Sequence, residues 1–295
     1  MAKVRYLQLD VFAARPGGGN PLGVVIDADH WPTDAMQRFA AWTNLVETTF
    51  LLPPGPSGAD YRLRIFTPTR EIAFAGHPTI GSAHAALATG LVRAGGGRLV
   101  QDCGAGLLPI LVEGVGEAQR LFVQAPGAQV LRQGLDGDPQ LQALLGDRRL
   151  GRLAPAFVEG GRRWWLAELA DAQEVRGWHP NHAAIAALAH ASDSLGLCVF
   201  ARCQGGDHDL VVRAFPAGVG IVEDPASGAA NGLIAAYIAH CEPEGPLGRG
   251  YVVSQGREIG HDARIEIRID GDGVWVGGQT QLVIEGHAEW PLATA

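Results

Sequence analysis

The chain has 295 residues, of which 47% are hydrophobic and 18% charged, and its formal net charge at neutral pH is −8. The length allows one large domain or two of ordinary size, and the composition is that of a globular protein rather than a disordered one. The acidic charge argues against a nucleic-acid partner, and the absence of a bilayer-length apolar stretch or a signal-peptide pattern predicts a cytoplasmic protein with no membrane partner.

Alternating and β-rich segments predict strands throughout the first half, with two helices between them. One helix begins at Thr33, and the other is Ala-rich, follows Phe74-Ala-Gly-His-Pro78 and runs to about Leu91. Arg70 and Glu71, which precede the second helix, are expected to be solvated. The predicted strands are residues 3–12, 22–26, 47–52, 61–66, 98–102, 107–113 and 120–124.

The second half repeats this order of strands and helices. One helix is predicted over 180–191, and a second, Ala-rich helix opens at Asp224-Pro225 and ends near Cys241. The predicted strands are residues 162–169, 195–201, 209–215, 250–255, 263–269, 274–278 and 281–285. A Gly/Gln/Asp-rich stretch from 126 to 150 is the predicted linker. We therefore expect an α/β (α+β) protein with subdomains over 1–125 and 126–285, and with the tail 286–295 packing on the first.

Three sequence matches in the same order indicate an internal duplication. Their offsets are 149, 147 and 150 residues, close to half the chain length, and one such match could arise by chance far more easily than three. The matches pair Arg64-Ile-Phe66 with Arg213-Ala-Phe215, His77–Ala83 with Asp224–Ala230, and Leu45 and Phe50 with Leu195 and Phe200. These offsets make Asp224 the counterpart of His77, Ala229 that of Ser82, and Leu197 that of Glu47.

Each copy of the repeat holds a Pro-x-x-Gly turn, from Pro78 to Gly81 and from Pro225 to Gly228. Proline suits the first helical position because its missing N–H needs no partner there, and the glycine allows another chain or a ligand to approach. The free N–H groups and the helix dipole favour anions. Two facing turns predict a site for a small carboxylate-bearing ligand; two ordinary helix starts packed on a sheet are the alternative.

Three ionisable residues accompany these turns. Glu47 begins an apolar strand, where burial would raise its pKa and suit it to acid/base catalysis near neutral pH. His77 titrates near neutrality and caps the first turn, and Asp224 takes the matching place in the second. Together they suggest proton transfer at a carbon next to a carboxylate. The alternatives are a solvated Glu47 and purely capping roles for His77 and Asp224.

The remaining chemistry-bearing residues have structural interpretations. The cysteines form no C-x-x-C pair and have no histidine at metal-ligand spacing, so we expect reduced thiols and no metal site. Cys198 lies in an apolar strand pattern and is expected to be buried. Tryptophans of the second half are expected to pack rather than to bind a cofactor. These residues are Cys103, Cys198, Cys203 and Cys241, and Trp164, Trp165 and Trp178.

In these motifs the chain resembles the PhzF-like family, the phenazine-biosynthesis isomerase family with the diaminopimelate epimerase fold. The motifs are Asp10-Val-Phe12, Gly19-Asn-Pro-Leu22, Asn44–Phe50, Arg64-Ile-Phe-Thr-Pro68, Phe74–Gly81, Glu223–Gly228 and Gln255-Gly256. The resemblance implies two pseudo-symmetric, barrel-like subdomains, each wrapped around a central helix, with the site between them. It also implies catalysis without a metal or cofactor, and a homodimer.

The resemblance makes Glu47 the principal proton-transfer residue, with His77 and Asp224 assisting. It implies that backbone groups of Gly76 and Gly228 hold the substrate carboxylate, and that the binding residues also include Pro78, Ser227 and Ala229. Related epimerases use two thiols at the turns, and His77 and Asp224 rule out that mechanism here. The family usually has Ser where this chain has Ala229, and often Gly-Arg-x-Ser where it has Gly260-His-Asp-Ala263, so a phenazine-pathway substrate does not follow.

The sequence therefore predicts an isomerase that acts on a small carboxylate-bearing metabolite. Two alternatives remain: an epimerase or racemase with carboxylate and imidazole bases, and a non-catalytic family member that binds a metabolite or a protein. The ionisable groups differ between the two halves, which favours moving a proton over inverting a centre with matched bases.

Overall fold

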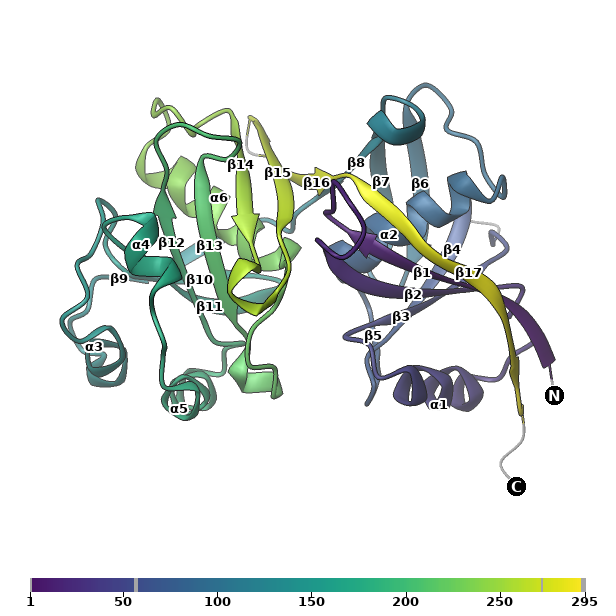
Figure 1. Cartoon of the computed structure of the whole chain (residues 1–295), viewed down its shortest axis with the longest axis horizontal. Coiled ribbons are helices and arrows are strands. Elements are labelled where there is room, and N and C mark those ends of the chain that lie inside the picture. The colour runs from purple at the N-terminus through teal and green to yellow at the C-terminus, as the bar shows by residue number, and fades with distance from the viewer. Residues whose placement is uncertain (1, 56–57, 272, 293–295) are drawn as a thin grey trace. The chain divides into compact units, whose positions relative to one another are not determined.

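The computed structural model describes residues 2–55, 58–271 and 273–292, and the chain forms two compact units (Figure 1). The first comprises Met1–Gln124 and Gly277–Ala295, and the second Ala125–Val276. The chain returns to the first unit at Gly277 rather than at 286, because the last strand pairs with the first strand along its full length. Within the described residues, no helix is long and apolar enough to cross a membrane.

The first unit is one continuous sheet with a helix on each face. The strands pair in the order β17-β1-β2-β3-β4-β6-β7-β8, and β5 adds to β4. The strands are β1 (Ala2–Val11), β2 (Asn20–Ile26), β3 (Thr48–Leu52), β4 (Tyr61–Phe66), β5 (Glu71–Ile72), β6 (Arg98–Cys103), β7 (Gly106–Glu113), β8 (Arg120–Gln124) and β17 (Thr280–Trp290). The helices are α1 (Thr33–Thr43), α2 (Gly76–Ala88) and the 3-10 turn η1 (Gly116–Ala118).

The second unit pairs its strands in the order β9-β10-β11-β12-β13-β14-β15. These strands are β9 (Gln129–Gln133), β10 (Ala156–Gly160), β11 (Arg162–Glu168), β12 (Leu197–Arg202), β13 (Leu210–Phe215), β14 (Gly250–Gln255) and β15 (Ala263–Asp270). The helical segments are α3 (Pro139–Leu145), α4 (Ala172–Arg176), α5 (His182–Ser192), η2 (Ala217–Val219), α6 (Gly228–Cys241) and η3 (Arg257–Ile259). Strand β16 (Gly273–Gly278) contains the boundary between the units.

The duplication predicted from the sequence is present in the strand pairing. From β1 to β7 the pairs alternate antiparallel, parallel, antiparallel, parallel and antiparallel, and the pairs from β10 to β15 repeat this alternation. The registers also agree: β3–β4 pairs Thr48 with Phe66, and β12–β13 pairs Leu197 with Phe215, both 149 residues later. Each unit is thus one copy of the same sheet.

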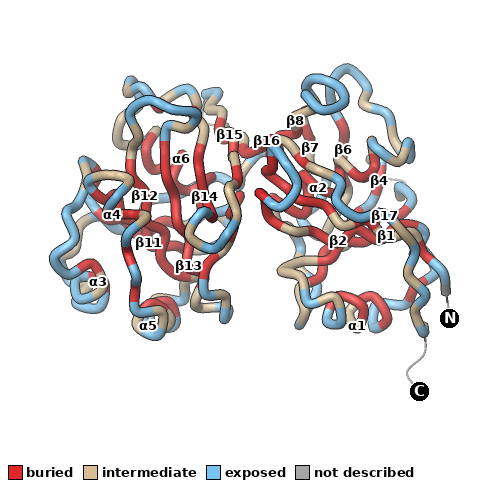
Figure 2. Tube along the Cα trace, viewed as in Figure 1, coloured by how far each residue is buried: buried red, intermediate tan, exposed pale blue. Residues whose placement is uncertain are grey.

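Each sheet has a central helix made mainly of small residues. Helix α2 contacts β1, β2, β3, β4, β8 and β17, and α6 contacts β10, β11 and β15. Figure 2 shows both helices as largely buried. A Cβ on Gly81 would lie 2.5 Å from the Leu22 side chain, so this glycine of the first Pro-x-x-Gly turn is needed for helix–sheet packing rather than for access by a ligand.

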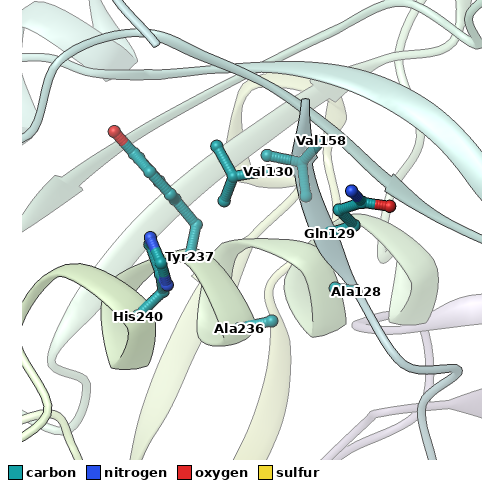
Figure 3. Close-up of a pocket in the computed structure, with 7 residues that line it drawn as sticks. All are labelled: Ala128, Gln129, Val130, Val158, Ala236, Tyr237 and His240. Atoms are coloured by element: carbon teal, nitrogen blue, oxygen red, sulfur yellow. The ribbon is translucent and has the colours of Figure 1, made fainter. Parts of the chain in front are cut away.

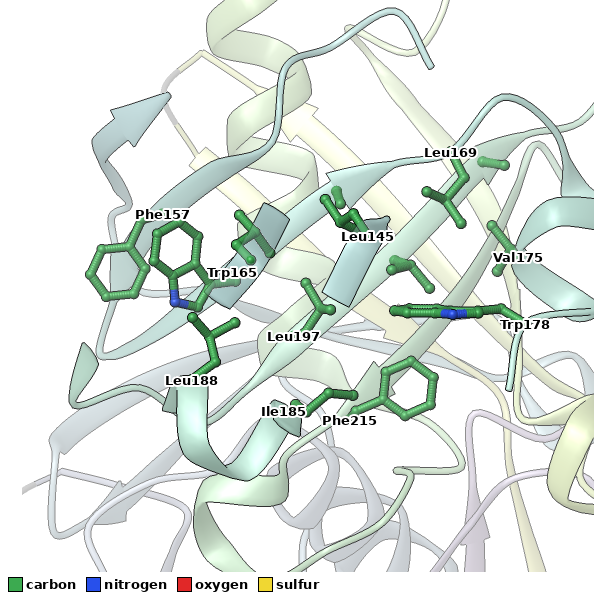
Figure 4. Close-up of a cluster of buried hydrophobic side chains, with 14 of the residues drawn as sticks. Leu145, Phe157, Trp165, Leu169, Val175, Trp178, Ile185, Leu188, Leu197 and Phe215 are labelled. Atoms are coloured by element: carbon green, nitrogen blue, oxygen red, sulfur yellow. The ribbon is translucent and has the colours of Figure 1, made fainter. Parts of the chain in front are cut away.

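The other face of each sheet carries the amphipathic helices. Helix α1 buries Met36 and Phe39 against Phe50 of β3. In the second unit, α3, α4 and α5 cover a cluster in which Trp165 stacks on Phe157 at 4.5 Å between ring centroids (Figure 4). The buried positions of all three tryptophans, and of Cys198, confirm the predicted packing roles; the tryptophans are Trp164, Trp165 and Trp178.

The predicted linker over 126–150 is partly wrong, because it contains both β9 and α3. Strand β9 pairs with β10, and neither strand was predicted from the sequence. Helix α3 is held by Leu141 and Leu145, which lie one helical turn apart and are both buried in the core cluster. Two apolar contacts in a seven-residue helix are too few to stand out from the surrounding Gly and Gln residues.

Candidate active site

The structure brings Glu47 and His77 together in the first unit. Glu47 directly precedes β3, and His77 lies in the first turn of α2. The Nδ1 atom of His77 is 3.4 Å from Oε2 of Glu47, and the two side chains are only 7% and 12% exposed. A carboxylate and an imidazole so placed can share or exchange a proton away from bulk water.

His77 does not titrate near neutrality, contrary to the sequence prediction. Burial lowers the pKa of His77 to about 3, because a charged imidazolium would lose its hydration there. A hydrogen bond to the backbone of Pro21 opposes this effect but is the smaller cause. His77 is therefore neutral near pH 7, and its contact with Glu47 is a polar contact with a neutral ring rather than an ion pair.

His77 is also not the cap of α2. The N-cap residue is Ala75, so His77 is the second helical residue and Pro78 the third, not the first. The first intrahelical bond runs from Thr79 N to Ala75 O at 3.2 Å. Helix geometry leaves the N–H groups of Gly76 and His77 without an intrahelical acceptor, and Pro78 has no N–H at all. The start of α2 therefore presents two donors to an anion.

Buried hydrogen bonds hold this helix start on the sheet. The hydroxyl groups of Thr49 and Ser82 lie 2.8 Å apart and join β3 to α2. Gln101 of β6 donates from Nε2 to the hydroxyl oxygen of Thr79 at 3.2 Å, and it accepts from the Tyr61 hydroxyl at 3.1 Å. These residues were not predicted from the sequence, because their partners lie 22 to 40 positions away and no local pattern links them.

In the second unit Asp224 lies before the helix rather than at its cap. Its N–H donates to Ala214 O at 2.9 Å, and Gln255 Nε2 donates to its carbonyl oxygen at 2.8 Å. One carboxylate oxygen, Oδ1, accepts from Ala226 N at 3.2 Å. The capping prediction for Asp224 was wrong: Ser227 is the N-cap residue of α6 and accepts from Ala230 N at 3.3 Å.

The Gln255-Gly256 motif holds this loop. Buried Asn231 of α6 donates from Nδ2 to Gln255 Oε1 at 2.8 Å and to Ser227 O at 2.9 Å, and Ser227 N donates to the same Gln255 oxygen. Gly256 has a φ of +90°, and a Cβ there would lie 2.5 Å from Pro225 O. A side chain at 256 would therefore displace the loop that carries Asp224 and Ser227.

The start of α6 also presents two open donors. Ser227 satisfies the third N–H, and helix geometry leaves those of Gly228 and Ala229 without an intrahelical acceptor. Ala229 is exposed, whereas Gly228 is buried. The predicted site residues thus form two groups, one in each unit: Glu47, Gly76, His77 and Pro78, and Asp224, Ser227, Gly228 and Ala229.

The structure corrects the correspondence between the two turns. Ile72 pairs with Ile65, and Asp224 bridges Ala214, which is the counterpart of Ile65 in the strand register. Four residues after each, at Gly76 and Gly228, the helices begin. Asp224 therefore corresponds to Ile72, not to His77, and His77 corresponds to Ala229. The match at offset 147 was out of register by five positions, because the second unit has three extra residues between strand and helix.

The counterpart of Glu47 also changes. The strand register makes Gly196 of the second unit, rather than Leu197, the counterpart of Glu47. Gly196 has a φ of +152°, and a Cβ there would overlap the carbonyl oxygen of Phe215. No side chain fits at this position, so the second unit has no room for a second Glu47.

Two hollows lie away from the predicted site residues. One has a volume of about 250 Å³ and lies between β9, β10 and α6 (Figure 3). The other, of about 270 Å³, lies beside Arg62, Arg64 and Asp102 in the first unit. Among residues 2–55, 58–271 and 273–292, no three His, Cys, Asp or Glu side chains are grouped as metal ligands.

A protein-family profile described as "Phenazine biosynthesis-like protein" matches residues 9–290. The chain belongs to this family. Two relatives of this PhzF-type chain match it over nearly their whole lengths. Trans-2,3-dihydro-3-hydroxyanthranilate isomerase of Pseudomonas aeruginosa is 33% identical over 96% of this chain and 99% of its own. "Antisense-enhancing sequence 1" of Schizosaccharomyces pombe is 31% identical over 98% of this chain and 99% of its own.

Solved structures agree with the PhzF-type assignment. The PhzF-family protein of Bacillus anthracis superposes with a TM-score of 0.84 at 25% identity, covering 98% of this chain and 100% of that one. A hydroxyproline epimerase of Agrobacterium vitis, at 14% identity, has a TM-score of 0.60 and covers 97% of this chain and 92% of that one, which shows the fold alone. The predicted family, epimerase-like fold and isomerase class are confirmed.

Proposed function

We propose that this PhzF-type isomerase moves a proton between carbons of a small carboxylate-bearing metabolite, without a metal or cofactor. Glu47 transfers the proton, and His77 and Asp224 assist. The observation that supports this most is the buried contact between Glu47 and a neutral His77 at the open end of α2. A carboxylate needs such a sheltered place, close to a bound anion, to take a proton from carbon.

The helix start suits the charge that this reaction develops. Removing a proton next to a carboxylate moves negative charge onto the carboxylate oxygens. Fixed N–H donors at Gly76 and His77 stabilise that charge more than they stabilise the ground state, because they already point at it. Neutral His77 lies beside Glu47 and adds no positive charge that would stabilise the Glu47 carboxylate and so weaken it as a base. Pro78 keeps this turn rigid.

The second group of residues supplies further contacts in this proposal. Asp224 positions or polarises the substrate, and the N–H groups of Gly228 and Ala229, with Ser227 at the cap, bind a polar substrate group. The resemblance further supports a cytoplasmic homodimer as the working form.

A direct test uses trans-2,3-dihydro-3-hydroxyanthranilate, named in the Pseudomonas aeruginosa relative, as the probe substrate. We expect the wild-type chain to isomerise it and, in deuterium oxide, to place solvent deuterium at the carbon that gains the proton. Glu47→Gln keeps the size of the side chain but removes the base, so turnover should fall by about 10²–10⁴-fold.

Glu117→Gln is the matched control, because Glu117 is an exposed carboxylate of the same unit and should retain wild-type turnover. Full turnover in Glu47→Gln would exclude Glu47 as the base. Inversion of a stereocentre without migration of a double bond would identify an epimerase instead.

A further inference from the structure

A buried ion pair stands directly beside Asp224. Arg213 of β13 donates to both carboxylate oxygens of Glu223, from Nε at 2.9 Å and from Nη2 at 2.8 Å. The side chains are only 7% and 3% exposed. Nη1 of Arg213 also donates to the carbonyl oxygens of Val175 and Trp178. Four donor contacts in one fixed plane leave this guanidinium a single orientation.

This pair fixes the residue that follows it. Glu223 immediately precedes Asp224, whose N–H is bonded to Ala214, the residue after Arg213. Glu223 is thus held by Arg213, and Asp224 by the next residue of the same strand. With Gln255 on the carbonyl oxygen of Asp224, the backbone of Asp224 is held on both sides. The side chain of Asp224 then has few allowed orientations. In the one observed, its Oδ1 accepts a hydrogen bond from Ala226 N.

The first unit holds an equivalent pair in a different setting. Arg64 donates to both carboxylate oxygens of Glu71 at 2.7 and 2.6 Å, and Glu71 is exposed to solvent, as predicted from the sequence. Both arginines also lie over the phenylalanine two residues on, at 5.1 and 5.0 Å from the ring centroid. The first pair is 22% and 40% exposed, however, and it precedes Ile72, which has no polar side chain to place.

We propose that Arg213 is a positioning residue, which acts through Glu223 to fix the carboxylate of Asp224. The proposal rests on the proposed function only for the role of Asp224 in the reaction; the positioning itself can be measured without a substrate. Burial of a charged pair is unfavourable unless its geometry is nearly ideal, and a paired, buried fork is better suited to fixing one conformation than to adding stability.

Positioning of Asp224 requires the planar guanidinium of Arg213 with its several hydrogen bonds, and not only its positive charge. Lysine would keep a positive charge near Glu223 but cannot make two parallel hydrogen bonds and reach two carbonyl oxygens at once. Arg213→Lys and Glu223→Gln should therefore both release the loop. Arg64→Lys and Glu71→Gln are the matched controls, because they change the equivalent pair in the other unit.

The experiment measures amide hydrogen exchange at Asp224 and Ala226, together with kcat and KM on trans-2,3-dihydro-3-hydroxyanthranilate. In Arg213→Lys and Glu223→Gln we expect both amides to exchange at least tenfold faster. We expect kcat to fall at least tenfold while KM changes less than threefold. The two control variants should leave the same amides and kcat within twofold. Should either second-unit variant fail to fold, Arg213→Met with Glu223→Gln removes both charges and leaves none unpaired.

Three results would overturn the proposal: unchanged exchange and kcat in the folded variants, wild-type behaviour of Arg213→Lys, or equal losses in the controls. A probe that the wild type does not turn over would contradict the proposed function alone, since the exchange rates still decide whether Arg213 positions Asp224.

Discussion

The two central helices differ in how the third N–H group of their first turn is satisfied or removed. In α2 the third N–H is absent because the residue is Pro78, and in α6 it is present on Ala230 but capped by Ser227. Each start therefore keeps two donors open, on Gly76 and His77 and on Gly228 and Ala229. The comparison teaches that the helix start with two open N–H groups was duplicated, whereas the side chains around it were not.

The side chains around the two starts differ more than their backbones. The second position of α2 is buried His77, and the second position of α6 is exposed Ala229. Glu47 contacts His77, whereas its counterpart Gly196 has no room for a side chain. The strand register thus excludes two matched bases, which agrees with a reaction in which one base moves a proton.

The largest effect is expected from forcing a carboxylate into the second unit. Gly196→Glu should cost more than about 4 kcal/mol of unfolding free energy, because its Cβ would overlap Phe215 O and its φ is +152°. Urea unfolding of the second unit measures this. Gly205→Ala, at a φ of +75° with open space around it, should cost only about 1–2 kcal/mol. A stable Gly196→Glu chain would refute the steric account of the asymmetry.

Next in size is the pH dependence that His77 gives the first unit. Its pKa falls from 6.5 to about 3 on folding, so below pH 6.5 the unfolded chain binds more protons than the folded chain. The stability from neutral His77 is complete above pH 6.5 and is lost as the pH falls toward 3, by about 1.4 kcal/mol per unit.

Urea unfolding between pH 7 and pH 4 measures this slope. His77→Asn should lack that contribution, so that its stability relative to wild type improves by about 2 kcal/mol between pH 7 and pH 5. His30→Asn, at a half-exposed histidine, should keep the wild-type slope. A parallel pH dependence of wild type and His77→Asn would mean that His77 is not held neutral.

A smaller effect on stability is expected from changing the N-cap residues of the two central helices. Ser227→Ala leaves the N–H of Ala230 without its cap, so it should destabilise the chain by about 1 kcal/mol. The reverse change, Ala75→Ser, should raise the unfolding free energy by less than about 0.5 kcal/mol, because Pro78 has no N–H and only the N–H of His77 is left for the hydroxyl to accept from. Thermal unfolding of both variants tests the comparison, and a gain of 1 kcal/mol in Ala75→Ser would contradict it.

The smallest effect is expected at Ala229. Ala229→Ser adds a hydroxyl at an exposed position, so stability should change by less than about 0.5 kcal/mol. If the hydroxyl donates to bound substrate, KM for the probe should fall by about fivefold, as one hydrogen bond allows. Ala143→Ser, at an exposed position of helix α3, should leave KM unchanged. A rise in KM for Ala229→Ser would show that the substrate of this chain requires the smaller side chain.

The sequence was enough to predict most of the strands, the central helices and the family, because these depend on local periodicity and on contiguous motifs such as Phe74–Gly81. It could not predict the register between the halves. The three extra residues that include η2 shift the second helix, and a chance match of Pro-x-x-Gly obscured this shift. The bonds from Gln255 to Asp224 and Asn231 join residues 24 to 31 positions apart, so no local pattern reveals them.

Strand β17 has a consequence for biosynthesis. Residues 280–290 are made long after the residues of β1, yet they pair with β1 in the sheet of the first unit. At about 5–20 residues per second, one side of β1 waits for tens of seconds on the ribosome. The second unit is contiguous and can fold in that interval. A chain that ends before 280 would leave one side of β1 unpaired, and such an exposed strand edge is a template for pairing with other chains.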